Sequence, residues 1–265
     1  MNSTRPSRAR SVTLDPAKPG APPHLQAVPC AFFLDVDGTL LPLSAHPREV
    51  HVPSPLLEIL KSLRDRSFGA LALVSGRSLA ALDACFTPER FALAGQHGAE
   101  RRDAAGELHV DCAHTGALGE IRPLVLELAS GIPGSFIEDK KLSIAIHIRD
   151  APGALAGLHE RLAEVLCAYP ALGLLKGKAV LEIRARLAEK GRALRAFLEE
   201  TPFRGRLPVC LGDDVTDESA FETVNRAGGV SIKVGAGLSC ARFRLTSPAR
   251  AVSWLARQTR TQDGS

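Results

Sequence analysis

Five consecutive apolar residues, Cys30–Leu34, lead directly into the sequence Asp35-Val36-Asp37-Gly38. A continuous apolar run of this length is typical of a strand that is buried on both faces, and such strands occur mainly in parallel sheets. An Asx turn at the end of the strand would account for one aspartate and the glycine, but not for two carboxylates. The run therefore predicts a central parallel strand with acidic groups at its carboxyl end, where open α/β sheets bind their ligands.

Apolar runs and amphipathic stretches alternate on both sides of a central segment of the chain. Before that segment we expect strands at 30–34, 69–74 and 91–94 with helices at 55–66 and 79–86, and after it strands at 207–211 and 229–234 with helices at 190–200 and 217–226. Strands that alternate with helices form a parallel sheet with right-handed crossovers and with helices on both faces. The pattern predicts a doubly wound, Rossmann-like α/β fold.

The central segment, residues 100–186, has a different pattern. Its expected strands, 108–111, 135–138, 142–148 and 179–183, are clustered, with helices only at 119–129 and 153–168. This arrangement is typical of an antiparallel sheet that carries two helices. We therefore predict an inserted α/β domain at 100–186 and a core domain made of 30–99 and 187–258, with a disordered leader at 1–29 and a disordered tail at 259–265.

The leader holds most of the excess charge. The formal net charge is +4, and four basic residues against one aspartate place +3 of it in residues 1–29. One tryptophan and one tyrosine in 265 residues leave little aromatic surface on which bases could stack. We therefore expect a small-molecule substrate and no nucleic-acid partner.

Other features bear on the compartment. The chain has no apolar run of about 18 residues that could span a membrane, and its leader lacks the hydrophobic segment of a secretory signal. Six cysteines stand far apart without a Cys-x-x-Cys pair, which favours reduced thiols over a zinc site or a disulfide framework. We expect a cytoplasmic monomer or weak oligomer with no membrane partner, and the Arg- and Ser-rich leader leaves an organelle transit peptide open.

Two further motifs stand at the starts of expected helices. Ser75-Gly76-Arg77 follows the strand at 69–74, where a hydroxyl and backbone N–H groups favour an anion, although a helix N-cap is the commoner explanation. Lys190 begins the helix at 190–200, where its charge opposes the helix dipole. It is either a solvated surface lysine or one whose charge is needed elsewhere.

A last motif, Gly212-Asp213-Asp214-Val215-Thr216-Asp217, follows the strand at 207–211. Its aspartates repel one another unless a cation or protonation compensates them. N-capping explains Asp217 but leaves Asp213 and Asp214 unexplained, and a divalent cation accounts for both.

These four segments occur in the order of the four motifs of the haloacid dehalogenase-like phosphatases, which the chain resembles from about residue 30 to residue 234. The resemblance implies that Asp35 is the nucleophile and forms an aspartyl-phosphate, and that Asp37 protonates the leaving oxygen and then activates water. A carboxylate nucleophile beside a proton donor divides a hard hydrolysis into two easier steps. Ser75 and Lys190 would bind the transferring phosphoryl oxygens.

The same resemblance implies a Mg²⁺ cofactor. The ion would be held by Asp35, the backbone carbonyl of Asp37 and Asp213. Asp214 and Asp217 would hold metal-bound waters or Lys190.

Three segments of the chain, 95–100, 138–149 and 177–182, are similar to those that mark trehalose-6-phosphate phosphatases, which carry an α/β cap between the second and third motifs. The resemblance implies hydrolysis of trehalose 6-phosphate, with Thr39, Gly76, Arg77, His97, Glu100, Glu138, Lys140, Lys178 and Glu182 as substrate-binding residues. Surface charges and strand-end ion pairs are the alternative interpretation of these side chains. A related phosphatase of sucrose phosphate or a monosaccharide phosphate, and a non-catalytic sugar-phosphate sensor, are the alternative functions.

Overall fold

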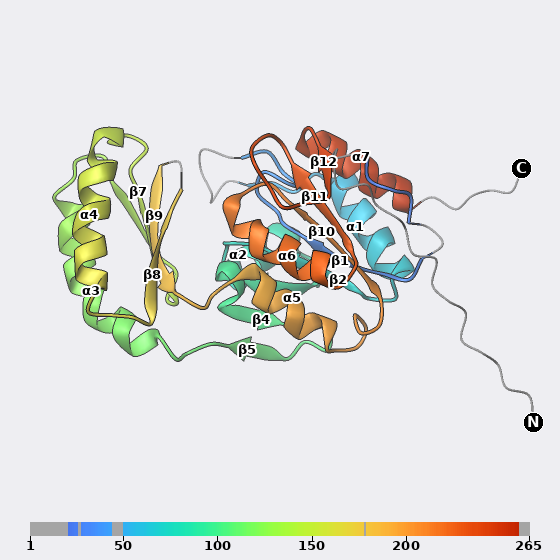
Figure 1. Cartoon of the computed structure of the whole chain (residues 1–265), viewed down its shortest axis with the longest axis horizontal. Helices are drawn as coiled ribbons and strands as arrows, with labels where there is room; N and C mark the ends of the chain where they lie inside the picture. The colour runs from blue at the N-terminus through green and yellow to red at the C-terminus, as the bar shows by residue number, and fades with distance from the viewer. Residues whose placement is uncertain (1–20, 26–27, 44–49, 178, 260–265) are drawn as a thin grey trace, which may run out of the picture.

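A computed structural model describes residues 21–25, 28–43, 50–177 and 179–259 of the chain. An eight-stranded sheet with the order β12-β11-β10-β1-β2-β3-β4-β5 forms the larger part of the molecule (Figure 1). Its strands are β1 (Cys30–Leu34), β2 (Leu71–Val74), β3 (Ala92–Gly95), β4 (Glu100–Arg102), β5 (Leu108–Val110), β10 (Leu207–Gly212), β11 (Val230–Val234) and β12 (Phe243–Leu245). All pairs from β12 to β3 are parallel, and β3, β4 and β5 pair antiparallel. The predicted doubly wound α/β core is confirmed.

Helices cover both faces of this sheet because its strands are apolar on both sides. In β1, Phe32 and Leu34 face a cluster that includes residues of α1 (Ser54–Arg66), α2 (Leu79–Phe86) and α7 (Pro248–Gln258). Phe33 points to the opposite side and packs with residues of α5 (Lys190–Leu198) and α6 (Glu218–Arg226). There its ring stacks on Phe203 with centroids 5.5 Å apart. This alternation explains why the run 30–34 contains no polar residue.

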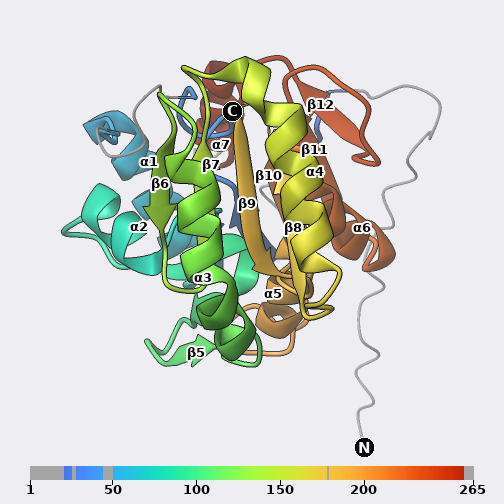
Figure 2. The same ribbon diagram turned by 90° about the vertical axis from the view of Figure 1, so that its left-hand side faces the viewer.

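A second sheet of four antiparallel strands, with the order β6-β7-β9-β8, forms the inserted unit, which we call the cap. Its elements are α3 (Thr115–Ser130), β6 (Phe136–Asp139), β7 (Ser143–His147), α4 (Leu155–Leu166), β8 (Leu172–Lys176) and β9 (Val180–Ala185). The helices α3 and α4 pack on one face through alternate strand residues such as Ile144, Ile146, Leu181 and Ile183. Figures 1 and 2 show that these helices lie on the side of the cap sheet away from the core, so the other face of this sheet is turned to the core.

The strands β4 and β5 lie in the core sheet, although the sequence prediction assigned all of residues 100–186 to the inserted domain. This assignment is wrong for β4 and β5. Arg101 and Arg102 of β4 are buried, on opposite faces of the strand. Arg101 forms two hydrogen bonds of 2.7 Å with Glu200, and Arg102 forms two of 2.7 Å with Asp83. Two charged pairs therefore replace the apolar contacts by which a core strand is normally recognised.

Part of the predicted disordered leader is packed against the core. Leu25 is buried in the core cluster, and its backbone N–H donates to Gln258 Oε1 at 2.9 Å. Trp254 Nε1 donates to the carbonyl of Pro22 at 3.4 Å. Residues 1–20, 26–27 and 260–265 lie outside the described part, which reaches one residue, Thr259, into the predicted tail. Within the described residues, none of the helices has the length and apolar character needed to cross a membrane.

The contact of Leu25 with the core can be tested by truncation. We expect Leu25→Ala to lower the free energy of unfolding by about 2–3 kcal/mol, because the change removes buried methyl groups and leaves a cavity. The same change at the fully exposed Leu238 should alter it by less than about 0.5 kcal/mol. Urea unfolding monitored by circular dichroism gives both values, and equal effects would show that residues 21–25 do not pack as described.

Candidate active site

The candidate active site lies at the carboxyl ends of β1, β2 and β10. These strands are neighbours, and Leu34 is in register with both Leu73 and Leu211. The residues that follow each strand therefore meet at one edge of the sheet. Asp35 follows β1, Ser75 follows β2 and Asp213 follows β10.

A buried lysine links two of the aspartates. Lys190 Nζ donates to Asp35 Oδ1 at 2.7 Å and to Asp217 Oδ1 at 2.6 Å, and all three side chains are less than one-tenth exposed. Burial alone would lower the pKa of Lys190, but the charges of Asp217 and Asp35 outweigh it and raise this pKa. Lys190 is therefore a charged residue of the site and not a surface lysine.

Glycine permits the close packing that brings Lys190 to this position. A Cβ on Gly191 would lie 2.3 Å from the carbonyl oxygen of Ser219, which is shorter than any allowed contact. The first turn of α5 can therefore approach α6 only with glycine at this position. The charge of Lys190 opposes the dipole at the start of α5, and the two aspartates compensate for it.

Asp217 orders the loop after β10. Its Oδ2 accepts the backbone N–H groups of Asp213 and Asp214, each at 3.0 Å, while its Oδ1 is bound to Lys190. Asp214 itself is exposed, and its side chain caps the short helix that follows. Among the described contacts, Asp214 has none with Lys190.

Asp35, Asp213 and Asp217 form a group that suits a cation, since each offers a carboxylate oxygen within 4.8 Å of the others. Asp35 Oδ2 is buried with no hydrogen-bond partner among the described residues. Burial and the charge of Asp217 raise the pKa of Asp213 to about 6. The single charge of Lys190 does not neutralise three carboxylates, so the site could also bind a hard cation that prefers oxygen ligands.

Gly38 and Thr39, which follow β1, both pack against Asp213. Thr39 is fully buried, and its hydroxyl donates to Asp213 Oδ1 at 3.5 Å. Gly38 has a φ of +84°, and a Cβ there would lie 2.1 Å from Asp213 Oδ2. The glycine after Asp37 is therefore required both by its left-handed backbone and by the space that Asp213 occupies.

Asp37 is held by Arg77. Arg77 Nε donates to Asp37 Oδ2 at 2.6 Å, and a terminal nitrogen of its guanidinium donates to Asp37 Oδ1 at 2.7 Å. Such paired hydrogen bonds fix the plane of the carboxylate. Ser75 is buried, and its oxygen accepts the backbone N–H of Arg77 at 3.1 Å. Arg77 was predicted to bind substrate, and in the structure its guanidinium is paired with Asp37.

The cap joins the core beside this group through Glu182 of β9. Glu182 Oε1 accepts from Lys140 Nζ at 3.3 Å and from the Ser143 hydroxyl at 2.7 Å, and its Oε2 lies 3.2 Å from His97 Nε2. Lys140 Nζ also donates to the carbonyl of Gly76 at 3.1 Å. We call Glu182, Lys140, Ser143 and His97 the cap junction.

The junction is a charged, buried network. Burial would raise the pKa of Glu182, but the hydrogen bond from His97 and the charge of Lys140 lower it, so Glu182 is a carboxylate. Burial lowers the pKa of His97. A neutral His97 that donates to Glu182 through Nε2 has an acceptor at Nδ1, and this buried atom has no partner among the described residues.

Gln96 and Ser143 were not among the substrate-binding residues predicted from the sequence. Ser143 Oγ lies 3.2 Å from Gln96 Oε1, so these side chains also join cap and core. Gln96 and His97 have φ values of 47° and 59°, a backbone region that non-glycine residues rarely adopt and that is common at functional sites. The sequence Gly95-Gln96-His97-Gly98, with a glycine on each side, was the available signal.

The other predicted residues lie at different distances from the junction. Glu100 Oε1 accepts from the backbone N–H of Leu79 at 3.0 Å and from Gln96 Nε2 at 2.8 Å, so it supports the core side of the junction. Glu138 is half-buried and pairs with His147 at 3.1 Å; this hydrogen bond lowers the pKa of Glu138. Lys178 lies outside the described residues.

Comparison with known proteins identifies the family. Residues 33–248 match the family model for trehalose-phosphatase. The chain is 44% identical over 228 residues to a trehalose-6-phosphate phosphatase of Escherichia coli, with 85% of each chain covered. The chain belongs to the trehalose-phosphatase family. The expected family is thereby confirmed.

Solved structures agree with the fold. The structure of a trehalose-6-phosphate phosphatase related protein aligns with a TM-score of 0.72 at 28% identity, and covers 84% of this chain and 94% of its own. A haloacid dehalogenase-like hydrolase from Bacteroides thetaiotaomicron aligns with a TM-score of 0.62 at 16% identity, over 85% of this chain and 98% of that one. The second likeness concerns the fold alone, and it matches the predicted Rossmann-like core with a cap.

The electrostatic role of Lys190 can be tested through stability. We expect Lys190→Met to lower the free energy of unfolding by about 3–5 kcal/mol near pH 7.5, because buried carboxylates lose their counter-charge. The loss should be smaller near pH 5. The pKa of Asp213 is raised from 3.8 to about 6, and the charge of Lys190 counteracts this rise. Without Lys190, Asp213 binds a proton more readily in the folded chain, which offsets part of the loss near pH 5, and this offset disappears as the pH rises well above 6.

Lys61→Met is the matched control for this experiment. Lys61 lies on α1 and pairs with Glu58 and Glu89 near the surface. Its replacement should lower the free energy of unfolding far less than that of Lys190, because exposed ion pairs contribute little to stability. Urea unfolding of both variants at the two pH values decides the question, and a pH-independent loss for Lys190→Met would argue against charge compensation.

Proposed function

We propose that this protein hydrolyses trehalose 6-phosphate to trehalose and phosphate. Membership of the trehalose-phosphatase family and the printed name of the 44% identical relative support this substrate. The observation that carries the proposal is the position of the cap junction. Lys140 of the cap donates to the carbonyl of Gly76, the residue between Ser75 and Arg77, so the polar face of the cap sheet meets the core at the candidate active site.

Asp35 is the proposed nucleophile. Lys190 holds its Oδ1, and its Oδ2 has no partner among the described residues and is the atom that attacks phosphorus. The new bond joins Asp35 Oδ2 to phosphorus, the bond from phosphorus to the sugar oxygen breaks, and the phosphoryl group remains on Asp35. Ser75 and Lys190 bind its oxygens. In the second step water attacks phosphorus and releases phosphate and the Asp35 carboxylate.

Asp37 is the proposed acid and base. A protonated Asp37 gives its proton to the sugar oxygen as this oxygen leaves, and the resulting carboxylate accepts a proton from the attacking water in the second step. The pair with Arg77 fixes the orientation of this carboxylate. We therefore assign Arg77 as a positioning residue for Asp37.

We propose that Asp35, Asp213 and the backbone carbonyl of Asp37 hold Mg²⁺. The donor set fits, since Asp35 and Asp213 offer carboxylate oxygens within 4.8 Å of each other, and hard oxygen ligands of this kind suit Mg²⁺. Bound Mg²⁺ would reduce the repulsion between the Asp35 carboxylate and the phosphate. Asp217 supports this site by fixing the Asp213–Asp214 backbone and Lys190. Asp214 would hold metal-bound water.

The cap junction is the proposed sugar site. A disaccharide presents many hydroxyl groups, and the junction offers a carboxylate, an ammonium and the free Nδ1 of His97 for them. In the structure these groups bond to one another, so the sugar must exchange some of these contacts for its own. Glu138 and Lys178 of the cap and Glu100 of the core remain proposed contributors, as does Thr39 beside Asp213.

The alternatives are a phosphatase of sucrose phosphate or a monosaccharide phosphate, and a non-catalytic sugar-phosphate sensor. They differ from the proposal in measurable ways. Because Asp35 and Asp37 are both present, an enzyme is better supported than a non-catalytic sensor. A related sugar phosphatase would use the same core residues but would not prefer trehalose 6-phosphate. We further propose a cytoplasmic protein without a nucleic-acid or membrane partner.

A substrate panel with a cap variant tests the substrate. We expect the highest kcat/KM for trehalose 6-phosphate, above sucrose 6-phosphate, glucose 6-phosphate and p-nitrophenyl phosphate. Glu182→Gln should lower kcat/KM for trehalose 6-phosphate by roughly tenfold to a hundredfold, because a charged hydrogen-bond acceptor is lost. With p-nitrophenyl phosphate the loss should be about threefold at most, since this substrate has no sugar for the cap to bind.

Glu160→Gln, an equivalent change at an exposed position of α4, is the control and should leave both rates unaltered. Phosphate release measured over the panel gives all values. A better substrate than trehalose 6-phosphate would contradict the proposed specificity, and equal losses on both substrates for Glu182→Gln would contradict its sugar role.

The two-step mechanism can be tested by trapping the intermediate. With p-nitrophenyl phosphate the first step needs little acid assistance, because nitrophenolate is a good leaving group. We therefore expect Asp37→Asn to accumulate phosphoenzyme after one turnover, whereas Asp35→Asn forms none and has no measurable turnover. Acid quenching followed by intact-protein mass spectrometry detects the adduct.

EDTA should abolish turnover, and Mg²⁺ should restore it. Turnover by Asp35→Asn, or full activity in EDTA, would refute this mechanism. Correct folding of each variant is checked by its circular dichroism spectrum.

A further inference from the structure

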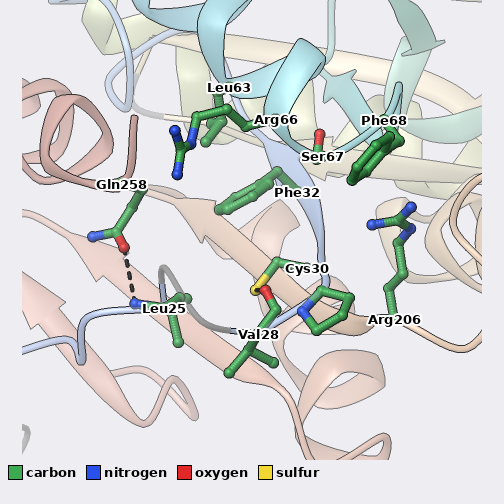
Figure 3. Close-up of a pocket in the computed structure, with 11 residues that line it drawn as sticks. Leu25, Val28, Cys30, Phe32, Leu63, Arg66, Ser67, Phe68, Arg206 and Gln258 are labelled. Atoms are coloured by element: carbon green, nitrogen blue, oxygen red, sulfur yellow. Dashed lines mark hydrogen bonds between the residues drawn. The ribbon is translucent and has the colours of Figure 1, made fainter. Parts of the chain in front are cut away.

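A pocket of about 300 Å³ lies at the opposite edge of the core sheet from the candidate active site (Figure 3). Cys30 and Phe32 line it from the start of β1, Ser67 and Phe68 from the segment before β2, and Arg206 from the residue before β10. The catalytic groups follow the carboxyl ends of these same strands. The length of these strands therefore separates this pocket from the candidate active site.

The charged residues that line the pocket are both arginines. Arg66 and Arg206 stand on different sides of it in Figure 3, and none of the described residues that line it is acidic. Burial raises the pKa of the Cys30 thiol to about 12, so this group carries no negative charge at neutral pH. The floor consists of apolar side chains such as Phe32 and Leu63. The pocket is therefore positively charged at its rim and apolar inside.

The other polar side chains of the pocket are already bonded. Gln258 accepts from the backbone N–H of Leu25 and donates to the carbonyl of Trp254, and Ser67 donates to the carbonyl of Arg64. Arg206 Nε donates to the carbonyl of Pro202 at 2.7 Å, and this hydrogen bond orients the guanidinium. Among the described residues nothing accepts from its terminal nitrogens, so a ligand could use them. Arg66 forms no ion pair within the described residues. The two guanidiniums are thus the donors that a ligand could use.

The helix dipole of α1 explains the position of Arg66 but not that of Arg206. Arg66 is the last residue of α1, and a cation there is favoured by the helix dipole. Arg206 comes from a different segment, and its guanidinium lies 5.6 Å from the centre of the Phe68 ring. Two cations from separate segments therefore border one apolar pocket.

The backbone of Phe68 ends α1 in a Schellman motif, in which the N–H groups of Phe68 and Gly69 bond to the carbonyls of Asp65 and Arg64, but the fold does not require an aromatic ring at this position. Its side chain is 79% exposed, and its φ of +52° lies in the left-handed region that bulky residues avoid. An exposed aromatic ring in an unfavourable backbone conformation contributes little to the stability of the core. A planar ligand in the pocket would cover this ring and use it as a contact surface.

We propose that this pocket binds an organic anion with a flat apolar body, such as an aromatic carboxylate or phosphate ester. The arginines bind the anionic group, and Phe32, Leu63 and Phe68 contact the apolar body. Carboxylate and phosphate share this chemistry. The proposed hydrolysis of a sugar phosphate does not depend on this site.

The fluorescent aromatic anion 8-anilinonaphthalene-1-sulfonate is a direct probe of the pocket. We expect saturable binding with one site per chain by fluorescence and calorimetry. The double variant Arg66→Ala/Arg206→Ala should weaken it by about tenfold or more, because two charged hydrogen-bond donors are lost. Arg161→Ala/Arg226→Ala, which removes the same charge from exposed positions of α4 and α6, should leave the affinity unchanged.

Phe68→Asn separates binding from stability. Asparagine tolerates the left-handed conformation, so Tm should stay the same or rise while the probe binds more weakly. N-phenyl-1-naphthylamine, the same body without the sulfonate, should bind more weakly than the anion. Benzoate and phenylphosphonate should displace the probe, and the better competitor identifies the preferred anionic group; inorganic phosphate should displace it less.

Several results would overturn the proposal. These are undiminished probe binding by the double-arginine variant or by Phe68→Asn, an equal loss in the charge control, and displacement by inorganic phosphate as effective as by the aromatic anions. Competitive inhibition of phosphate release by the probe would place it at the active site and would also overturn the proposal. The double-arginine variant should release phosphate at the wild-type rate, which verifies its fold.

Discussion

The ammonium group of Lys190 is the interaction on which the candidate active site depends. It binds Asp35, 155 residues earlier in the chain, and Asp217 on the loop after β10. Without this charge, the group of Asp35, Asp213 and Asp217 would place three carboxylates close together with no protein cation bonded to Asp35 and Asp217. Burial of an unpaired charge costs more than most single contacts supply, so the position of α5 and the chemistry of the site are linked.

The same lysine limits what Asp35 can do. One oxygen of Asp35 is committed to Lys190, and the other is buried and free of partners in the described chain. A carboxylate held in this way presents a single oxygen in a fixed direction. This arrangement suits the in-line attack on phosphorus that we propose for Asp35, since it keeps the carboxylate from rotating away from the reacting direction.

The cap sheet, which we propose binds the sugar, has one apolar face and one polar face. In β9, Leu181 and Ile183 pack against the cap helices, and Glu182 between them points to the core. Period-two alternation thus gives the cap sheet one face that packs on its own helices and one face that contacts the core. Glu182 bonds to His97 and Lys140, so each of these polar groups of the cap junction has a partner within the protein.

The sequence predicts those parts of the fold in which apolar residues alternate or run continuously, and it predicts that the polar residues after these strands lie together. It does not predict partners that lie far apart in the chain. β4 contains two arginines and was not recognised as a core strand, because Arg101 is matched by Glu200 and Arg102 by Asp83. Arg77 was expected at the substrate, and no local signal indicates its pair with Asp37.

The two edges of the core sheet differ in their electrostatic preference for anions, because helices begin at one edge and end at the other. At the edge that carries Asp35, α2 and α5 begin, so their N-terminal dipoles favour an anion there. At the other edge α1 ends, and its C-terminal dipole repels an anion. An anion site there needs cations from side chains, which is the role that Arg66 and Arg206 would have. The asymmetry of the βαβ unit therefore supplies helix N-terminal dipoles at the Asp35 end of β1, whereas an anion at the other end of β1 would depend on side-chain cations.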